Sequence, residues 1–81
     1  MDFRELQQRL VARLRARIHS GELTERGLAR MGGISQPHLH NVLKGKRLLS
    51  ADMADEIMHR LHMDLLDLIQ PADLPDWRRH H

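Results

Sequence analysis

The chain has 81 residues, of which 41% are hydrophobic and 30% are charged, and its formal net charge is +2. This length and composition predict one small globular domain rather than a disordered segment. The absence of cysteine excludes a disulfide framework and a cysteine-ligated zinc site, and no apolar run approaches the length of a membrane span or a signal-peptide core, so we expect a cytoplasmic protein.

The first predicted helix occupies about residues 3–18. Asp2 and Glu5 have the spacing of a capping box at its start. Apolar residues then recur at steps of three and four, which is typical of one buried helix face: Phe3, Leu6, Leu10, Leu14 and Ile18. Gly21 follows the predicted end of the helix, a place where glycine is favoured.

Two shorter helices are predicted on either side of Gly32-Gly33. Thr24 is placed to cap the second helix and Ser35 the third. We expect one of the two glycines to adopt the left-handed conformation that other residues avoid. The residues predicted to face inward are Leu28, Met31, Leu39, Val42 and Leu43.

The rest of the chain predicts a fourth helix, a fifth short helix and a tail. Ser50 is expected to cap the fourth helix, and Asp64 a fifth helix that runs through Ile69. The inner face of the fourth helix is formed by Met53, Ala54, Ile57 and Leu61. We therefore expect an all-α fold of five short helices, with the domain over residues 1–70 and a tail over residues 71–81.

The charge is unevenly distributed along the chain. Residues 1–50 carry ten Lys and Arg against four Asp and Glu, whereas residues 51–81 carry three Arg against seven Asp and Glu. This asymmetry indicates a molecule whose basic side meets a polyanion such as nucleic acid. An ordinary surface of mixed charge is the alternative interpretation.

The two short helices and the turn between them carry the most specific pattern. Small, glycine and apolar residues follow the spacing Thr24-x3-Leu28-Ala29-x3-Gly33-Ile34-Ser35-x3-Leu39-x2-Val42-Leu43-x-Gly45. Together with Ser50-x3-Ala54-x2-Ile57 and Leu65-Leu66, this spacing resembles the phage-repressor-like (Xre-type) helix-turn-helix family over about residues 3–70. A helical hairpin in a bundle that does not bind DNA is the alternative.

The resemblance implies a DNA-binding transcriptional regulator of bacterial or phage type, whose third helix, about residues 35–44, lies in the major groove. The base-reading residues that it implies are Gln36, Pro37, His38, His40 and Asn41. Gln and Asn can form two hydrogen bonds with adenine, proline can touch a thymine methyl group, and histidine can donate to guanine. The phosphate contacts that it implies are made by Thr24, Ser35, Lys44, Lys46 and Arg47.

The chain departs from the family pattern in three places. Glu25 stands where many members have Gln, and a carboxylate there would be repelled by a phosphate. Ile18 and Leu43 form an apolar pair where some members carry a buried Arg–Glu pair. His38 and His40 are unusual in the reading helix, so the operator sequence does not follow from the resemblance.

No metal site, cofactor or catalytic activity is expected. His59 and His62 are three residues apart, but the sequence places no third metal ligand beside them. No nucleophile turn or glycine-rich phosphate loop is visible, so the chain is not expected to be an enzyme. Arg9, Arg13 and Arg17 recur on one face of the first helix, as a solvated ridge or as further phosphate contacts.

We expect a regulator, of repressor type, that binds double-stranded DNA in the nucleoid as a homodimer on a pseudo-palindromic operator. An antitoxin of a toxin–antitoxin pair is one alternative, because such proteins use this fold and also bind a toxin protein. The apolar residues of the tail, Leu74 and Trp77, would serve a dimer contact or such a partner. A helical protein-interaction module without DNA binding is a further alternative, favoured by Glu25.

Overall fold

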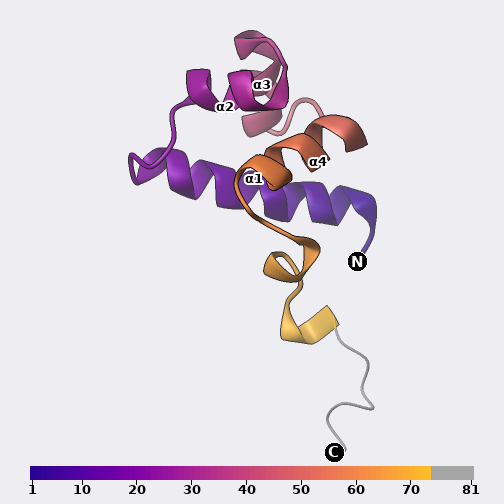
Figure 1. Cartoon of the computed structure of the whole chain (residues 1–81). Helices are drawn as coiled ribbons and strands as arrows, with labels where there is room; N and C mark the ends of the chain where they lie inside the picture. Colours follow the sequence, from indigo (N-terminus) through magenta and orange to yellow (C-terminus); the bar gives the residue numbers. More distant parts are fainter. Residues whose placement is uncertain (74–81) are drawn as a thin grey trace, which may run out of the picture.

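A computed structural model describes residues 1–73 as an all-helical unit (Figure 1). It contains four α-helices and two short 3₁₀ helices: α1 (Phe3–His19), α2 (Glu25–Gly32), α3 (Gln36–Leu43), α4 (Ala51–Arg60), η1 (Leu65–Asp67) and η2 (Pro71–Asp73). No strand occurs within the described residues, and the prediction of an all-α fold is confirmed.

The prediction of a fifth α-helix is wrong. Asp64 caps this segment and forms a reciprocal capping box with Asp67, but the ordered turn is the three-residue helix η1. The carbonyl of Leu65 accepts a hydrogen bond from the N–H of Leu68 at 3.0 Å, which closes a 3₁₀ turn. Pro71 lacks an N–H and restricts the residue before it, so only a single turn fits between the cap and the proline.

Each α-helix begins at the polar residue that the sequence predicts as its cap. In every case the side-chain oxygen accepts a hydrogen bond from the backbone N–H three residues later, and the four caps are Asp2, Thr24, Ser35 and Ser50. α2 ends at Gly33, which has a φ of 65°, so the expected left-handed glycine is confirmed. The local sequence therefore determines where the four α-helices begin.

The core is built from apolar side chains of all four α-helices, of the loop that precedes α4, and of the segment that follows it, where Met63 and Leu68 are buried. The most deeply buried of these are Leu10, Leu14, Leu28, Leu39, Val42, Leu49 and Ile57. α2 packs closely on α4, since a Cβ on Gly32 would lie only 3.0 Å from the side chain of Ile57. The periodicity predicts that Phe3 faces inward, but it is 50% exposed, because at the first turn of α1 it meets only a shallow groove beside Leu65.

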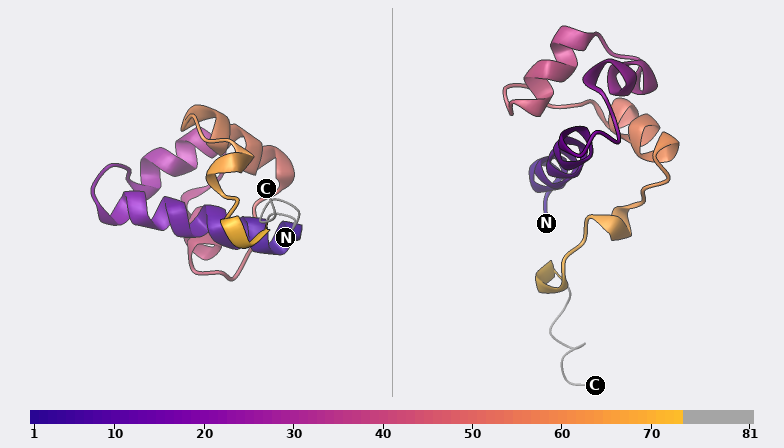
Figure 2. Two further views of the ribbon diagram at one scale, coloured as in Figure 1. Left: turned by 90° about the horizontal axis from the view of Figure 1, so that it is seen from below. Right: turned by 90° about the vertical axis from the view of Figure 1, so that its left-hand side faces the viewer.

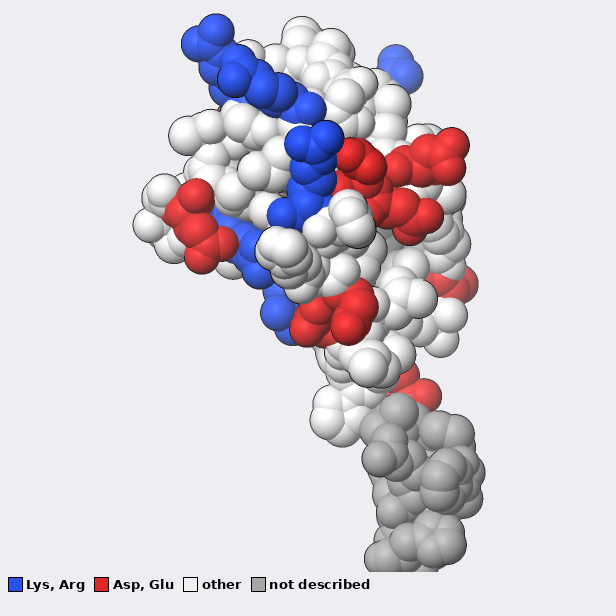
Figure 3. Space-filling model, viewed as in Figure 1, with Lys and Arg blue, Asp and Glu red and all other residues white. Residues whose placement is uncertain are grey.

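The helix α1 lies between two parts of the molecule. Figure 1 shows α2 and α3 on one side of α1, and the segment from η1 to η2 on the other. In the right-hand view of Figure 2, α3 and the loop after it lie on one flank of α1, and α4 lies on the opposite flank. Acidic side chains gather over α4 (Figure 3), so the charge asymmetry of the sequence is also an asymmetry in space.

Two arginines of α1 hold the C-terminal segment in place. The Nη1 of Arg9 donates to the carbonyl of Leu68 at 2.9 Å, and the same guanidinium pairs with the carboxylate of Asp73. The Nη2 of Arg13 donates to the carbonyl of Asp67 at 2.6 Å. These two members of the expected ridge therefore make contacts within the chain, and residues 71–73 of the expected tail pack with the domain.

Acid is expected to weaken the contact between Arg9 and Asp73. The hydrogen bonds that Asp73 accepts from Arg9 and from the backbone N–H of Gln70 lower its pKa to about 2. A carboxylate whose pKa is lowered by folding stabilises the folded state above its unfolded pKa, and this contribution is lost as the pH falls from about 4 to about 2. Urea unfolding should therefore show Asp73→Asn to be less stable than the wild type at pH 7, with a much smaller difference at pH 2. An equal difference at both pH values would contradict this role of Asp73.

Candidate nucleic-acid interface

A tight turn joins α2 to α3 and orients the two helices. After Gly33, the backbone N–H of Ile34 donates to the carbonyl of Ala29 at 3.0 Å, and the Ile34 side chain packs against the core. The hydroxyl of Ser35 then accepts a hydrogen bond from the N–H of His38 and starts α3. α2 packs against α3, so the first turn of α3 is held at the surface by the helix before it.

α3 has a buried face and an exposed face. Its core-facing residues are Leu39, Val42 and Leu43. Three of the five residues that the sequence suggests for base reading are exposed, namely Gln36, Pro37 and His40, and the other two, His38 and Asn41, are half-buried. The start of α3 thus has a polar surface that is exposed to solvent, and the opposite, apolar face of the helix packs against the core.

His38 is turned partly inward. Its Nε2 is buried and has no hydrogen-bond partner among the described residues. This nitrogen is therefore closed to an outside acceptor such as guanine, and the expectation that His38 donates to DNA does not hold for that atom. The exposed residues Gln36 and His40 on the same helix are better placed to meet a ligand.

Glu25 lies beside His40. The Oε1 of Glu25 is 3.3 Å from the Nδ1 of His40, and the contact is an ion pair when the imidazole is protonated. The carboxylate that departs from the family pattern therefore has a partner on α3. The sequence does not predict this contact between the start of α2 and the exposed face of α3, because the two residues are 15 positions apart.

The loop after α3 carries three cations at the surface. Lys44, Lys46 and Arg47 are exposed, and within residues 1–73 none of them forms an ion pair. Gly45 has a φ of 79°, and the N–H of Lys46 donates to the carbonyl of Asn41 at 2.8 Å, so the loop is a defined turn. Uncompensated cations on an ordered turn are suited to binding an anion.

The two capping hydroxyls among the expected phosphate contacts are already used within the chain. Thr24 accepts a hydrogen bond from the N–H of Gly27 at 3.0 Å, and Ser35 accepts one from His38 at 3.2 Å. Because a hydroxyl also has a proton to donate, each cap retains one hydrogen bond for a phosphate oxygen. Both residues are exposed, as such a contact requires.

A polar side chain that sequence reasoning missed secures the basic loop. Gln7 of α1 is 2% exposed, and it is the buried polar residue of the described chain. Its Nε2 donates to the carbonyl of Leu49 at 2.7 Å, and its Oε1 accepts from the N–H of Leu49 at 3.1 Å. In the sequence, the only indication of this contact is a glutamine that stands beside the apolar face of the first helix.

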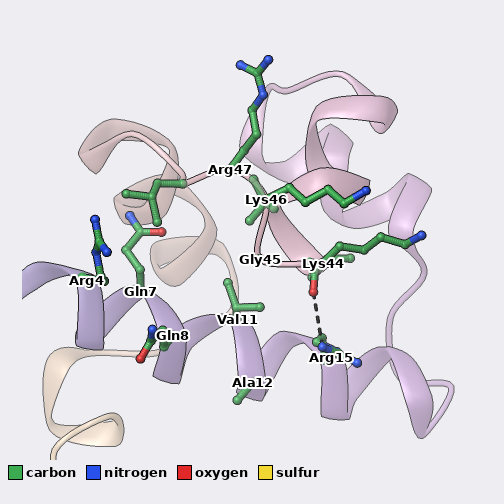
Figure 4. A pocket seen from close by; sticks show the side chains of 13 residues that line it. Arg4, Gln7, Gln8, Val11, Ala12, Arg15, Lys44, Gly45, Lys46 and Arg47 are labelled. Atoms are coloured by element: carbon green, nitrogen blue, oxygen red, sulfur yellow. Dashed lines mark hydrogen bonds between the residues drawn. The ribbon is translucent and has the colours of Figure 1, made fainter.

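A groove of about 500 Å³ separates the basic loop from α1 (Figure 4). Arg4 and Arg15 of α1 line it from one side, and the loop cations line it from the other. The Nη1 of Arg15 also donates to the carbonyl of Leu43 at 3.4 Å. The helical spacing of Arg4, Gln8, Val11 and Arg15 indicates this second face of α1 in the sequence.

The described residues offer no group of three side chains that is suited to hold a metal ion. His59 lies in α4, whereas His62 follows its end with a φ of 55°, so the two do not share a helix face. Nor does any helix in this part of the chain have the length and apolar character needed to cross a bilayer.

Comparisons of the chain with protein-family models, with curated proteins and with solved structures found no match.

Proposed function

We propose that this chain is a sequence-specific DNA-binding transcriptional regulator that resembles the phage-repressor-like (Xre-type) proteins, with α2 and α3 as its helix-turn-helix. The observation that carries this function is the exposed polar first turn of α3 followed, at the other end of the helix, by three exposed cations that form no ion pair within residues 1–73. An α-helix fits the major groove of B-DNA, where residues near its start reach base edges and nearby cations meet phosphates.

Three polar or apolar residues of α3 have a role in base reading in this arrangement. Gln36 and Asn41 are suited to two hydrogen bonds with adenine, and Pro37 to contact with a thymine methyl group. The cations that bind phosphates independently of sequence are Lys44, Lys46 and Arg47. Occupation of an operator in the nucleoid would exclude polymerase, which makes the regulator a repressor without requiring catalysis or a cofactor.

Selection from a pool of random duplexes tests this function directly. The full chain is incubated with the pool at low salt, and bound sequences are recovered and read. A regulator of this kind enriches one half-site, repeated with two-fold symmetry at a spacing of about one helical turn. Failure to retain any duplex at low salt would instead assign the chain to protein interaction alone.

Replacement of Gln36 is expected to relax the sequence preference at one base pair. The Gln36→Ala variant should lose roughly 1–3 kcal/mol of discrimination at that position and keep the preference elsewhere. Binding of a duplex panel with single substitutions across the selected site measures the effect. An unchanged preference at every position would show that Gln36 does not read a base.

The exposed apolar residues near η1 favour a homodimer. Leu66 is 76% exposed, and Leu65 and Phe3 line a shallow groove between α1 and α4. The segment η1 lies across α1 from α2 and α3, so a second copy bound at Leu66 leaves both reading helices free (Figure 1). Leu74 and Trp77, which the sequence also suggests for this contact, lie outside the described residues.

Sedimentation at micromolar concentration tests the homodimer. The wild-type chain should sediment as a dimer, and Leu66→Asp as a monomer, because the substitution places a charge in an apolar contact without disturbing the core. Leu48→Asp is the matched control, since Leu48 is exposed on the basic loop. A wild-type chain that sediments as a monomer would contradict the dimer.

An antitoxin is the second candidate function. It is favoured by the same apolar residues, together with the acidic charge of α4, because this combination suits a protein partner with basic and apolar side chains. The two candidates differ in which partner covers the exposed Leu66: a second copy of the chain or a toxin protein. A dimer in the purified chain supports the simple regulator, whereas a toxin encoded beside this gene supports the antitoxin.

A further inference from the structure

The groove between α1 and the basic loop gathers five cations and no acid. Arg4 and Arg15 come from α1, and the others are Lys44, Lys46 and Arg47; none of the residues that line the groove is Asp or Glu. Figure 4 shows Arg4 and Arg15 toward opposite ends of the labelled stretch of α1, with the loop cations across from them. Such a cluster repels itself unless an anion is bound.

Three other arginines of the described chain have acidic partners, whereas Arg4 and Arg15, like Arg13, Arg26 and Arg30, have none. Arg9 pairs with Asp73, Arg17 with Glu22, and Arg60 with Glu56. Neither Arg4 nor Arg15 forms an ion pair within residues 1–73. Their charge is therefore available to a ligand.

The two walls of the groove are held at a fixed separation. The paired hydrogen bonds of Gln7 with Leu49 secure the end of the loop to α1, and the hydrogen bond from Arg15 to the carbonyl of Leu43 secures its beginning. Arg4 and Arg15 are 11 residues apart, which corresponds to about 16 Å along the helix. The groove is thus preorganised and long enough to accommodate more than one phosphate.

We propose that this groove binds phosphates of the DNA backbone, so that Arg4 and Arg15 of α1 extend the phosphate-binding surface beyond the loop. The groove begins at Lys44, where α3 ends. A DNA strand that passes the end of the reading helix would therefore continue along the groove. Guanidinium groups bind phosphate through two parallel hydrogen bonds, and Val11 and Ala12 present small side chains between them. The inference rests on the proposed function, because it requires that the chain bind DNA.

The salt dependence of binding to one duplex tests the groove. Each phosphate contact contributes about 0.9 to the slope of log affinity against log salt concentration. The Arg4→Gln, Arg15→Gln double variant of the full chain should therefore show a slope shallower by about 1.8 per bound chain. Between 50 and 200 mM salt, its affinity should fall by a factor that is smaller than that of the wild type by about tenfold for each bound chain, or about 10²-fold for a dimer.

Three variants control for charge and folding. Arg17→Gln with Arg60→Gln removes the same charge from outside the groove and should leave the slope close to that of the wild type. Arg4→Lys with Arg15→Lys keeps both charges and should preserve the slope. Arg4→Gln alone avoids the hydrogen bond of Arg15 with Leu43, and it should lower the slope by about 0.9 even if the double variant is unstable.

The possible outcomes distinguish a failure of the groove proposal from a failure of the proposed DNA binding. A wild-type slope near zero would overturn DNA binding itself. A steep wild-type slope, with the groove variant no different from the Arg17 and Arg60 control, would overturn only the groove. Saturable binding of inorganic phosphate to the wild-type chain but not to the groove variant, with equal salt slopes of the two chains for DNA, would assign the groove to a free phosphate and overturn its assignment to DNA; we expect unequal slopes.

Discussion

DNA affinity is expected to fall at least about 10³- to 10⁴-fold when the salt concentration rises from 50 to 200 mM. The loop cations and the capping residues of α2 and α3 suggest about six to eight phosphate contacts per dimer, each of which releases counterions, so these contacts alone should give a log–log slope of about −5 to −7, to which the groove would add about −1.8 per chain. Fluorescence anisotropy of a labelled duplex at several salt concentrations measures this slope. A nearly flat titration would contradict DNA binding.

The contribution of the loop can be isolated by replacing Lys46 and Arg47 with Ala. Because phosphate contacts do not discriminate between sequences, the double variant should bind every duplex of a panel more weakly by a similar factor. The slope should also become shallower by about 0.9 for each phosphate that is no longer bound. Loss of preference at one base pair would instead show that one of these residues reads a base.

Replacement of Gln7 is expected to destabilise the fold by about 2–5 kcal/mol, because Gln7→Ala leaves the buried N–H and carbonyl of Leu49 without partners. A domain of this size has little stability to spare, so a large part of the variant should be unfolded at 37 °C. Urea unfolding followed by circular dichroism measures the change.

Gln8→Ala is the matched control for Gln7→Ala. Gln8 is the next residue of the same helix, is exposed, and its substitution should change the free energy of unfolding by less than about 0.5 kcal/mol. Equal effects of the two substitutions would show that the hydrogen bonds with Leu49 do not hold the loop. DNA binding of Gln7→Ala, measured at a temperature where it is folded, should also be weaker, because the loop cations are then less firmly positioned.

The helices follow from interactions between neighbours in the chain. Asp2, Thr24, Ser35 and Ser50 each bond to a backbone N–H three residues later, so the amino acid at the cap is enough to predict the helix start. The left-handed turn at Gly33 is equally local, since only glycine adopts this conformation at low cost. The exposure of Gln36 and Pro37 then follows from the periodicity of Leu39, Val42 and Leu43.

The three-dimensional packing decides the contacts between residues far apart in the sequence. Arg9 and Asp73 are 64 positions apart, and Gln7 and Leu49 are 42 apart, so no local pattern pairs them. The same packing turns the Nε2 of His38 inward, leaves Phe3 exposed and brings Arg4 and Arg15 to the basic loop. Helix boundaries depend on hydrogen bonds within one turn, whereas the basic groove depends on which helix faces meet, and only burial of the shared core selects those faces.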